Sequence, residues 1–127
     1  MKQTEQSKTY KPLHSIRPHK LAEGITARVV EGERLSMAVV DLDPNAVLPE
    51  HHHDNEQLGF VIKGSLTMRI GTEKRVLYPG DTYAIPSHVP HDAVTGPDGA
   101  TVVDVFAPPR ADWAQLERPE TSTPRWP

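Results

Sequence analysis

Short apolar runs divided by proline and glycine constrain the fold of this chain more than any other feature. The 127 residues include 13 prolines and 8 glycines, scattered along the chain rather than clustered. Because proline and glycine interrupt helices and mark turns, runs as short as these are typical of strands. The strand-like runs cover residues 24–30, 35–42, 57–63, 65–70, 74–78, 82–86, 89–94 and 100–106. About eight to ten short strands at even spacing predict an all-β sandwich or barrel.

Length, charge and composition limit the classes of protein that remain. A chain of 127 residues is long enough for one core and too short for two. Its formal net charge of −3 gives no broad basic surface, so we expect no nucleic-acid partner. The absence of cysteine excludes disulfides and thiolate metal ligands. The polar residues 1–8 do not resemble a signal peptide and no apolar run reaches membrane-spanning length, so we expect a cytoplasmic protein without a membrane partner.

The sequence predicts one folded domain between two polar ends. The predicted parts are a mobile N-terminal segment (1–12), a domain (13–116) and a C-terminal tail (117–127) that is loose or packed on a neighbour. A short helix is expected to begin near Pro109, with Trp113 and Leu116 closing over an apolar edge.

Histidines gather just before the strand-like run at 57–63. In an extended strand side chains alternate between faces, so His51 and His53 point the same way and His52 points the opposite way. Gln57 opens the next run and adds an amide oxygen, while His91 begins a distant run from which a fourth ligand can converge. Imidazole suits zinc, nickel, copper and iron. The pattern therefore predicts one metal site with four ligands.

The histidines also have a simpler interpretation. Three histidines in a row can form a solvated loop, and a single histidine after a proline is often structural. The metal interpretation is favoured because two histidines on one face, a spaced glutamine and a distant histidine would all have to coincide. We expect His52 and His88 to point outward or to lie in a turn rather than to bind metal.

The histidine stretch resembles the first of two signature motifs of the cupin superfamily. That motif reads His-x-His, three or four residues, Glu, six residues, Gly. Its positions are filled here by His51, His53, Gln57 and Gly64. Gln57 therefore stands where the motif has its glutamate.

A second stretch resembles the other cupin motif, which reads Gly, five residues, Pro-x-Gly, two residues, His. Its positions are filled by Gly80, Pro86, His88 and His91. His88 replaces a glycine, and histidine is among the few other residues tolerated at positive φ. The resemblance covers roughly residues 35–108. It implies a cupin jelly-roll barrel with one metal ion inside.

The four expected ligands form a neutral set. A divalent ion held by them (zinc, nickel, iron or manganese) keeps its full charge toward the open positions, which favours a small anionic or oxygen-chelating substrate. A glutamate at position 57 would help stabilise oxidised iron, as in oxygenases with two histidines and one carboxylate. Its absence favours Lewis-acid chemistry without redox.

A narrower resemblance rests on the glutamine of the first motif together with residues 104–110. These are similar to the cupins that linearise unsaturated uronates in pectin and alginate degradation, whose members make open-chain keto acids. The resemblance implies that Asp104 moves protons, Arg110 binds the substrate carboxylate and Phe106 shapes the pocket. Alternation places Asp104 on one face with Val102 and Phe106. An equal alternative is that Asp104 pairs structurally with Arg110 or with backbone amides.

One further charged residue lies inside an apolar run. Arg28 is expected to face outward from a half-exposed strand. The alternative is an anion-binding residue at the barrel mouth that would contact the substrate.

An apolar row is expected on the outer side of the Gln57 strand. It consists of Leu58, Phe60 and Ile62, which water should not contact. A second subunit is the natural cover, so we expect a homodimer.

Three function classes remain open at this stage. The first is a metal-dependent isomerase or lyase of carbohydrate degradation. The second is an iron or nickel oxygenase of a small molecule, and the third is a cupin that binds a small ligand without catalysis. Turnover of unsaturated uronates would favour the first, and oxygen uptake with ferrous iron the second.

Overall fold

The computed structural model describes residues 7, 9–120 and 122–127. Its elements are η2 (Leu13–Ser15), β1 (His19–Ala22), β2 (Ile25–Glu31), β3 (Ser36–Leu42), β4 (Val47–His51), β5 (Glu56–Ile70), β6 (Glu73–Leu77), β7 (Thr82–Ile85), β8 (His91–Ala107) and η3 (Ala111–Gln115). Strands dominate these residues, which confirms the all-β prediction. None of the helices described is long and apolar enough to span a membrane. Most of the expected mobile N-terminal segment, residues 1–6 and 8, lies outside the described residues.

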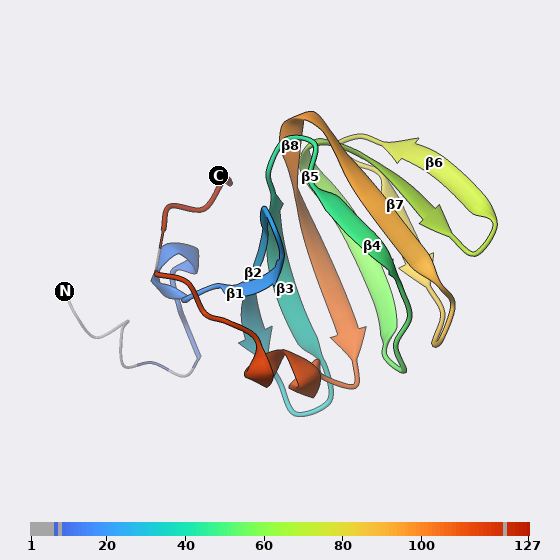
Figure 1. The fold of residues 1–127 in the computed structure, drawn as a ribbon. Coiled ribbons are helices and arrows are strands. Elements are labelled where there is room, and N and C mark those ends of the chain that lie inside the picture. Colours follow the sequence, from blue (N-terminus) through green and yellow to red (C-terminus); the bar gives the residue numbers. More distant parts are fainter. Residues whose placement is uncertain (1–6, 8, 121) are drawn as a thin grey trace.

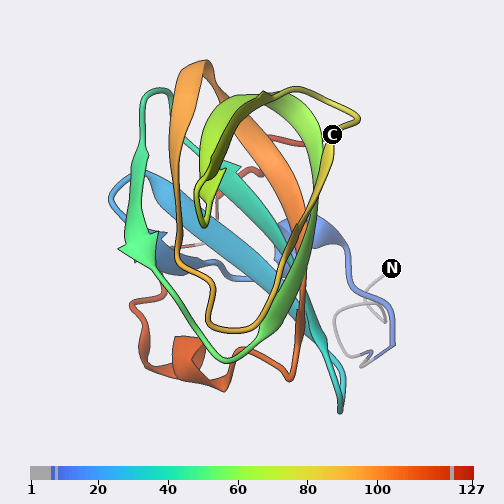
Figure 2. The same cartoon turned by 90° about the vertical axis from the view of Figure 1, so that its right-hand side faces the viewer.

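Two long strands, β5 and β8, organise the barrel because each changes neighbours along its length. The first half of β5 pairs with β7 and the end of β8, and its second half pairs with β6 and the start of β8. In the same way β8 pairs with β4 near its start and with β3 near its end. These pairings are all antiparallel, and β2 and β1 continue the sheet beyond β3. The strands therefore curve around a shared interior (Figures 1 and 2).

The first half of β5 shows how alternation divides the inside of the barrel from the outside. Gln57, Gly59 and Val61 are buried, whereas Leu58 and Phe60 are 51% and 44% exposed. This is the arrangement that the two-residue period of a strand predicts. The predicted faces are thus confirmed from Gln57 to Val61, whereas Ile62 is half-buried where the register with β8 shifts.

A glycine allows β5 to bend between its first half and its second half. The register between β5 and β8 shifts twice between Val61 and Leu66. Gly64 lies in this bend with a φ of +75°, and a Cβ on it would lie 1.9 Å from the carbonyl oxygen of Gly99. Both the backbone conformation and the close approach therefore require glycine here.

The C-terminal helix closes one end of the barrel, beside the end of β8 (Figure 1). Trp113 is buried in the core cluster, and Leu116 packs against that cluster. The predicted contact of these two side chains with an apolar edge is confirmed. The helix is a 3-10 helix and begins at Ala111, directly after Arg110.

Arg28 differs from its predicted exposure. It lies on the outer face of β2, but its side chain is only 2% exposed and its Nη1 lies 3.2 Å from Asp41 Oδ2. Its Nη2 donates a hydrogen bond to the carbonyl oxygen of Ser122 in the C-terminal tail. The prediction of a half-exposed arginine is wrong because the tail covers it.

The C-terminal tail packs on the outer face of the protein's own sheet, against residues of β1, β3 and β5. The backbone N–H of Arg125 donates to Asp41 Oδ2 at 3.2 Å, and Lys63 Nζ donates to the carbonyl oxygen of Arg125 at 2.8 Å. Nearer its start, the carbonyl oxygen of Glu117 accepts a hydrogen bond from the backbone of Lys20 at 2.8 Å. The tail is therefore packed rather than loose.

Candidate metal centre and cavity

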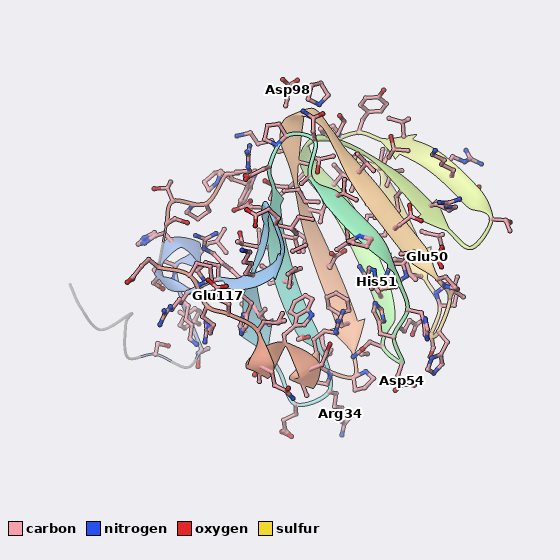
Figure 3. The ribbon with its side chains drawn as sticks, in the orientation of Figure 1. Arg34, Glu50, His51, Asp54, Asp98 and Glu117 are labelled. Carbon is pink, nitrogen blue, oxygen red and sulfur yellow. The ribbon has the colours of Figure 1, made fainter. Side chains whose placement is uncertain are left out.

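Three histidines meet inside the barrel although they come from different elements. His51 ends β4 and His91 begins β8, and the two are register partners in the β4–β8 pair. His53 follows in the connection to β5. One ligand nitrogen from each ring lies within 4.8 Å of the other two. Figure 3 places His51 well away from Asp98, toward the end of the barrel where Asp54 and Arg34 lie.

Backbone carbonyls fix the orientation of all three rings. The Nδ1 atoms of His51, His53 and His91 lie 2.9, 3.0 and 2.9 Å from the carbonyl oxygens of Pro49, Asn55 and Val89. An Nδ1 that faces a carbonyl must carry the proton, because the oxygen can only accept. Each Nε2 is then left with a free lone pair. This is the tautomer in which metal-binding histidines are commonly held.

The environment of these nitrogens fits a cation. Within the described part of the chain, the buried Nε2 of His91 has no hydrogen-bond partner. Burial lowers the pKa of His53 and lowers that of His91 to about 4, so both rings are neutral at pH 7. Neutral imidazoles with free lone pairs are suitable ligands for a divalent metal.

Gln57 joins this group from β5. It is 6% exposed, and its Oε1 lies 3.1 Å from Nε2 of His53. With the amide oriented in this way, both atoms are acceptors, and a cation bound to both would satisfy them. The structure thus brings together all four residues that the motifs indicated, and the histidine cluster is able to bind a metal ion.

Asp104 lies in β8 on the inner face and is 6% exposed. The hydroxyl of Tyr83 donates a hydrogen bond to its Oδ1 at 2.6 Å. Burial raises the pKa of Asp104 to about 6, although hydrogen bonds from Tyr83 and Gln57 and the charge of Arg110 oppose the shift. A carboxyl group with such a pKa can exchange a proton near neutral pH. The alternative in which Asp104 pairs with Arg110 is not what the structure shows.

Arg110 has a different carboxylate partner. Its Nε and Nη2 donate to the two carboxylate oxygens of Asp112 at 3.0 and 2.9 Å. Its guanidinium carbon lies 4.8 Å from the ring centre of Phe106 and 4.5 Å from that of Trp113. Contact with two aromatic rings holds a cation in place without neutralising it.

These side chains line one cavity of about 360 Å³, within the usual size range of small-molecule sites. Its polar wall carries His51, Gln57, Tyr83, His91, Asp92, Asp104, Arg110 and Asp112, and its remaining wall is mostly apolar. His53 lies beside two of the lining residues. Its ring centre is 4.9 Å from that of His91 and 5.8 Å from that of Phe106. Arg28 is not among the lining residues because its guanidinium is on the outer side of the sheet. It is therefore no longer a candidate for substrate binding.

Sequence reasoning missed Tyr83 and Asp112. Tyr83 could have been found, because alternation puts it on the same face as Ile85 in the strand of the second motif. Asp112 had only the weak signal of lying two residues after an arginine. The expectations for the other histidines are confirmed: His52 and His88 are exposed, and His88 has a φ of +67°.

The barrel and its inward-facing histidines define the class of protein. The model of the cupin domain family matches residues 38–106, which is just over half of the chain. The chain belongs to this family, as its two motifs indicated.

Within this family, the chain is similar to several particular proteins. The pectin degradation protein KdgF of Dickeya dadantii is 33% identical over 95 residues, which cover 73% of this chain and 86% of that protein. The solved structure of KdgF from a Halomonas species is also 33% identical, with a TM-score of 0.72 over 78% of this chain and 92% of that one. An RmlC-like cupin from Shewanella frigidimarina has the same TM-score at 26% identity, over 77% of this chain and 88% of that one.

Proposed function

We propose that this protein is a metal-dependent cupin that converts small unsaturated uronates, such as those from pectin or alginate, to open-chain keto acids. Its similarity to KdgF supports this, because the name of the Dickeya protein places that relative in pectin degradation. The observation that carries the proposal is that Asp104, Phe106 and Arg110 line the cavity that contains the histidine cluster. The carboxylate, the aromatic ring and the cation are thus available to one small molecule.

Arg110 provides the group that binds the substrate carboxylate. Guanidinium matches a carboxylate in two-pronged geometry, as its pairing with Asp112 already illustrates. Asp112 is 60% exposed at its side chain and can give way to a ligand, whereas Arg110 is only 9% exposed and held by Phe106 and Trp113. The carboxylate of the sugar then lies at the η3 end of the cavity.

Asp104 provides the proton transfer. Linearisation of an unsaturated uronate removes the proton of the anomeric hydroxyl, breaks the bond between the anomeric carbon and the ring oxygen, and returns a proton to the alkene carbon. The product is a single open-chain molecule that carries both an aldehyde and a ketone, so the net reaction is an isomerisation that needs no oxidant. A buried carboxylate with a pKa of about 6 is suited to accept and return this proton.

The metal ligands of the proposal are His51, His53, Gln57 and His91. When bound, a divalent ion (zinc, nickel, iron or manganese) supplies a Lewis acid for the oxygen that gains negative charge during ring opening. The neutral ligand set leaves its charge available to an anionic substrate, and this favours non-redox chemistry over the oxygenase alternative.

The proposal is tested by incubating protein purified without an affinity tag, loaded in turn with each metal, with unsaturated galacturonate and its alginate-derived counterparts. NMR should show the open-chain keto acid forming faster than in a control with metal and no protein. A protein that is inactive on every uronate would contradict the proposal. Oxygen uptake with ferrous iron would then favour an oxygenase, and saturable uronate binding without turnover a ligand-binding cupin.

A further inference from the structure

Tyr83, Gly59 and Asp104 occupy adjacent positions across three strands. In the β5–β7 pair Gly59 is the register partner of Tyr83, and in the β5–β8 pair it is the register partner of Asp104. Tyr83 and Asp104 both line the cavity. The two side chains are therefore separated only by the strand position that Gly59 occupies.

The missing side chain at Gly59 allows the tyrosine to reach the carboxylate. A Cβ on Gly59 would lie 2.0 Å from Cζ of Tyr83 and 2.4 Å from its hydroxyl oxygen. Gly59 is not among the glycines with positive φ, so its backbone does not require glycine. What requires glycine is the space that the phenol ring fills as it crosses β5.

The hydroxyl of Tyr83 ends this crossing at Oδ1 of Asp104, 2.6 Å away. A short hydrogen bond to a buried carboxylate fixes its rotation and favours its charged form against burial. Burial and the neighbouring Asp104 raise the pKa of Tyr83 well above its usual value, so its hydroxyl keeps the proton that it donates.

We propose that Tyr83 is a positioning residue that orients the Asp104 carboxylate for proton transfer, and that Gly59 is glycine so that Tyr83 can do so. This inference rests on the proposed function of Asp104. It assigns a role to Tyr83, which lies in the strand of the second motif and is not one of the four proposed metal ligands. The simpler alternative is that the Tyr83 ring only fills space.

Tyr83→Phe separates these two roles because it keeps the ring and removes only the hydroxyl. If Tyr83 positions Asp104, kcat should fall by about tenfold or more while KM stays within about twofold, since the lost interaction acts on proton transfer. Metal content should remain that of the wild type. Tyr78→Phe is the matched control, because Tyr78 is 58% exposed and is not among the residues lining the cavity.

Gly59→Ala provides an independent route to the same effect. Its methyl group should push the Tyr83 ring away from Asp104 and lower kcat about as much as Tyr83→Phe does. The two changes together should lower kcat by much less than the product of their separate effects, because both break one hydrogen bond.

Three outcomes overturn parts of the scheme separately. An active wild type whose Tyr83→Phe variant keeps its kcat overturns the positioning role and leaves the proposed function intact. The positioning role is also overturned if Tyr78→Phe lowers kcat and the unfolding temperature as much as Tyr83→Phe does. A general structural effect would then be sufficient. A wild type inactive on every uronate overturns the proposed function, and with it this role for Tyr83.

Discussion

At the scale of single residues, the site separates two carboxylates with different tasks. Asp104 is buried and bonded to the Tyr83 hydroxyl, whereas Asp112 is exposed and paired with Arg110. The hydrogen bond with Arg110 lowers the pKa of Asp112, and burial raises that of Asp104. Environments that move two carboxyl pKa values in opposite directions give one group a proton to exchange and leave the other charged.

The metal ligands give the first prediction. The double variant His53→Ala/His91→Ala should lose stoichiometric metal, because it removes two of the three nitrogens that converge within 4.8 Å. Elemental analysis of untagged, dialysed protein measures this loss. His52→Ala is the control, since His52 is exposed in the connection after β4 and is not part of the histidine cluster, and it should keep its metal. Unchanged metal content in the double variant would exclude this site.

The buried carboxylate gives the second prediction. Asp104→Asn keeps the shape and removes the ionisable group, so kcat on an active uronate should fall by roughly 10²–10⁴-fold while metal content stays constant. Asp98→Asn is the control, because Asp98 lies at the opposite end of the barrel (Figure 3). Wild-type turnover in Asp104→Asn would remove Asp104 from the mechanism.

The guanidinium gives the third prediction. Arg110→Lys keeps the charge and loses the two-pronged geometry, so KM should rise by about tenfold with a smaller change in kcat. Steady-state kinetics over a range of uronate concentrations separates the two effects. A variant with unchanged KM would show that another group binds the carboxylate.

At the scale of elements, buried charged residues on β2 and β3 join the sheet to the C-terminal tail. Arg28 on β2 and Asp41 on β3 form an ion pair, and Thr101 on β8 donates a hydrogen bond to Asp41 Oδ1 at 3.0 Å. The tail adds its backbone at Ser122 and Arg125. A buried ion pair of this kind is costly to break from one side, because the remaining charge stays buried.

The fourth prediction follows from this pair. Arg28→Ala should lower the free energy of unfolding by about 3–5 kcal/mol, because Asp41 would lose its counter-charge in a buried position. Urea denaturation measures the change. Arg69→Ala is the control, since the Arg69 side chain is 49% exposed and its pair with Asp92 should contribute at most about 1 kcal/mol. Equal losses in the two variants would contradict the assignment. Metal content should not change in either.

At the scale of the whole molecule, the outer face of the β2–β3–β8–β5 sheet is apolar where the tail does not cover it. Val30, Met37, Leu58 and Phe60 are 45%, 39%, 51% and 44% exposed, and they lie on neighbouring strands. Register links this face across strands, since Met37 and Leu58 are both partners of Val105. An exposed apolar sheet face suits a second copy of itself related by a two-fold axis.

The fifth prediction is therefore a homodimer formed through this face. Phe60→Lys should shift the protein toward the monomer in sedimentation velocity, because the charge would be buried at the interface. Val76→Lys on β6 is the control, since Val76 is 52% exposed on a different strand. A wild type that remains monomeric at high concentration would exclude the dimer.

The sequence alone predicted most of the residues that form strands, the two faces at the start of the Gln57 strand and the four candidate ligands, because each depends on local rules. It missed β1 and β4, and it divided β5 and β8 into two runs each. Alternation assigns His51, His53 and Gln57 to the inside, and proline and glycine mark the turn at Pro79 and Gly80, although Gly64, Gly96 and Pro97 lie within strands. The motifs then place His91 with them through a recognised family pattern. The burial of Trp113 was likewise predictable, because a large apolar side chain is stabilised when it packs against the core.

Only the tertiary structure determined which partners the buried polar and charged side chains have. Asp104 bonds to Tyr83 because β5 lies between their strands and has a glycine at the shared position. Arg28 is buried because a tail residue 94 positions away in sequence, Ser122, returns to cover it. Such contacts join residues far apart in the chain, and no local periodicity records them. Alternation gives the face on which a side chain lies, but the pairing of strands determines its neighbours.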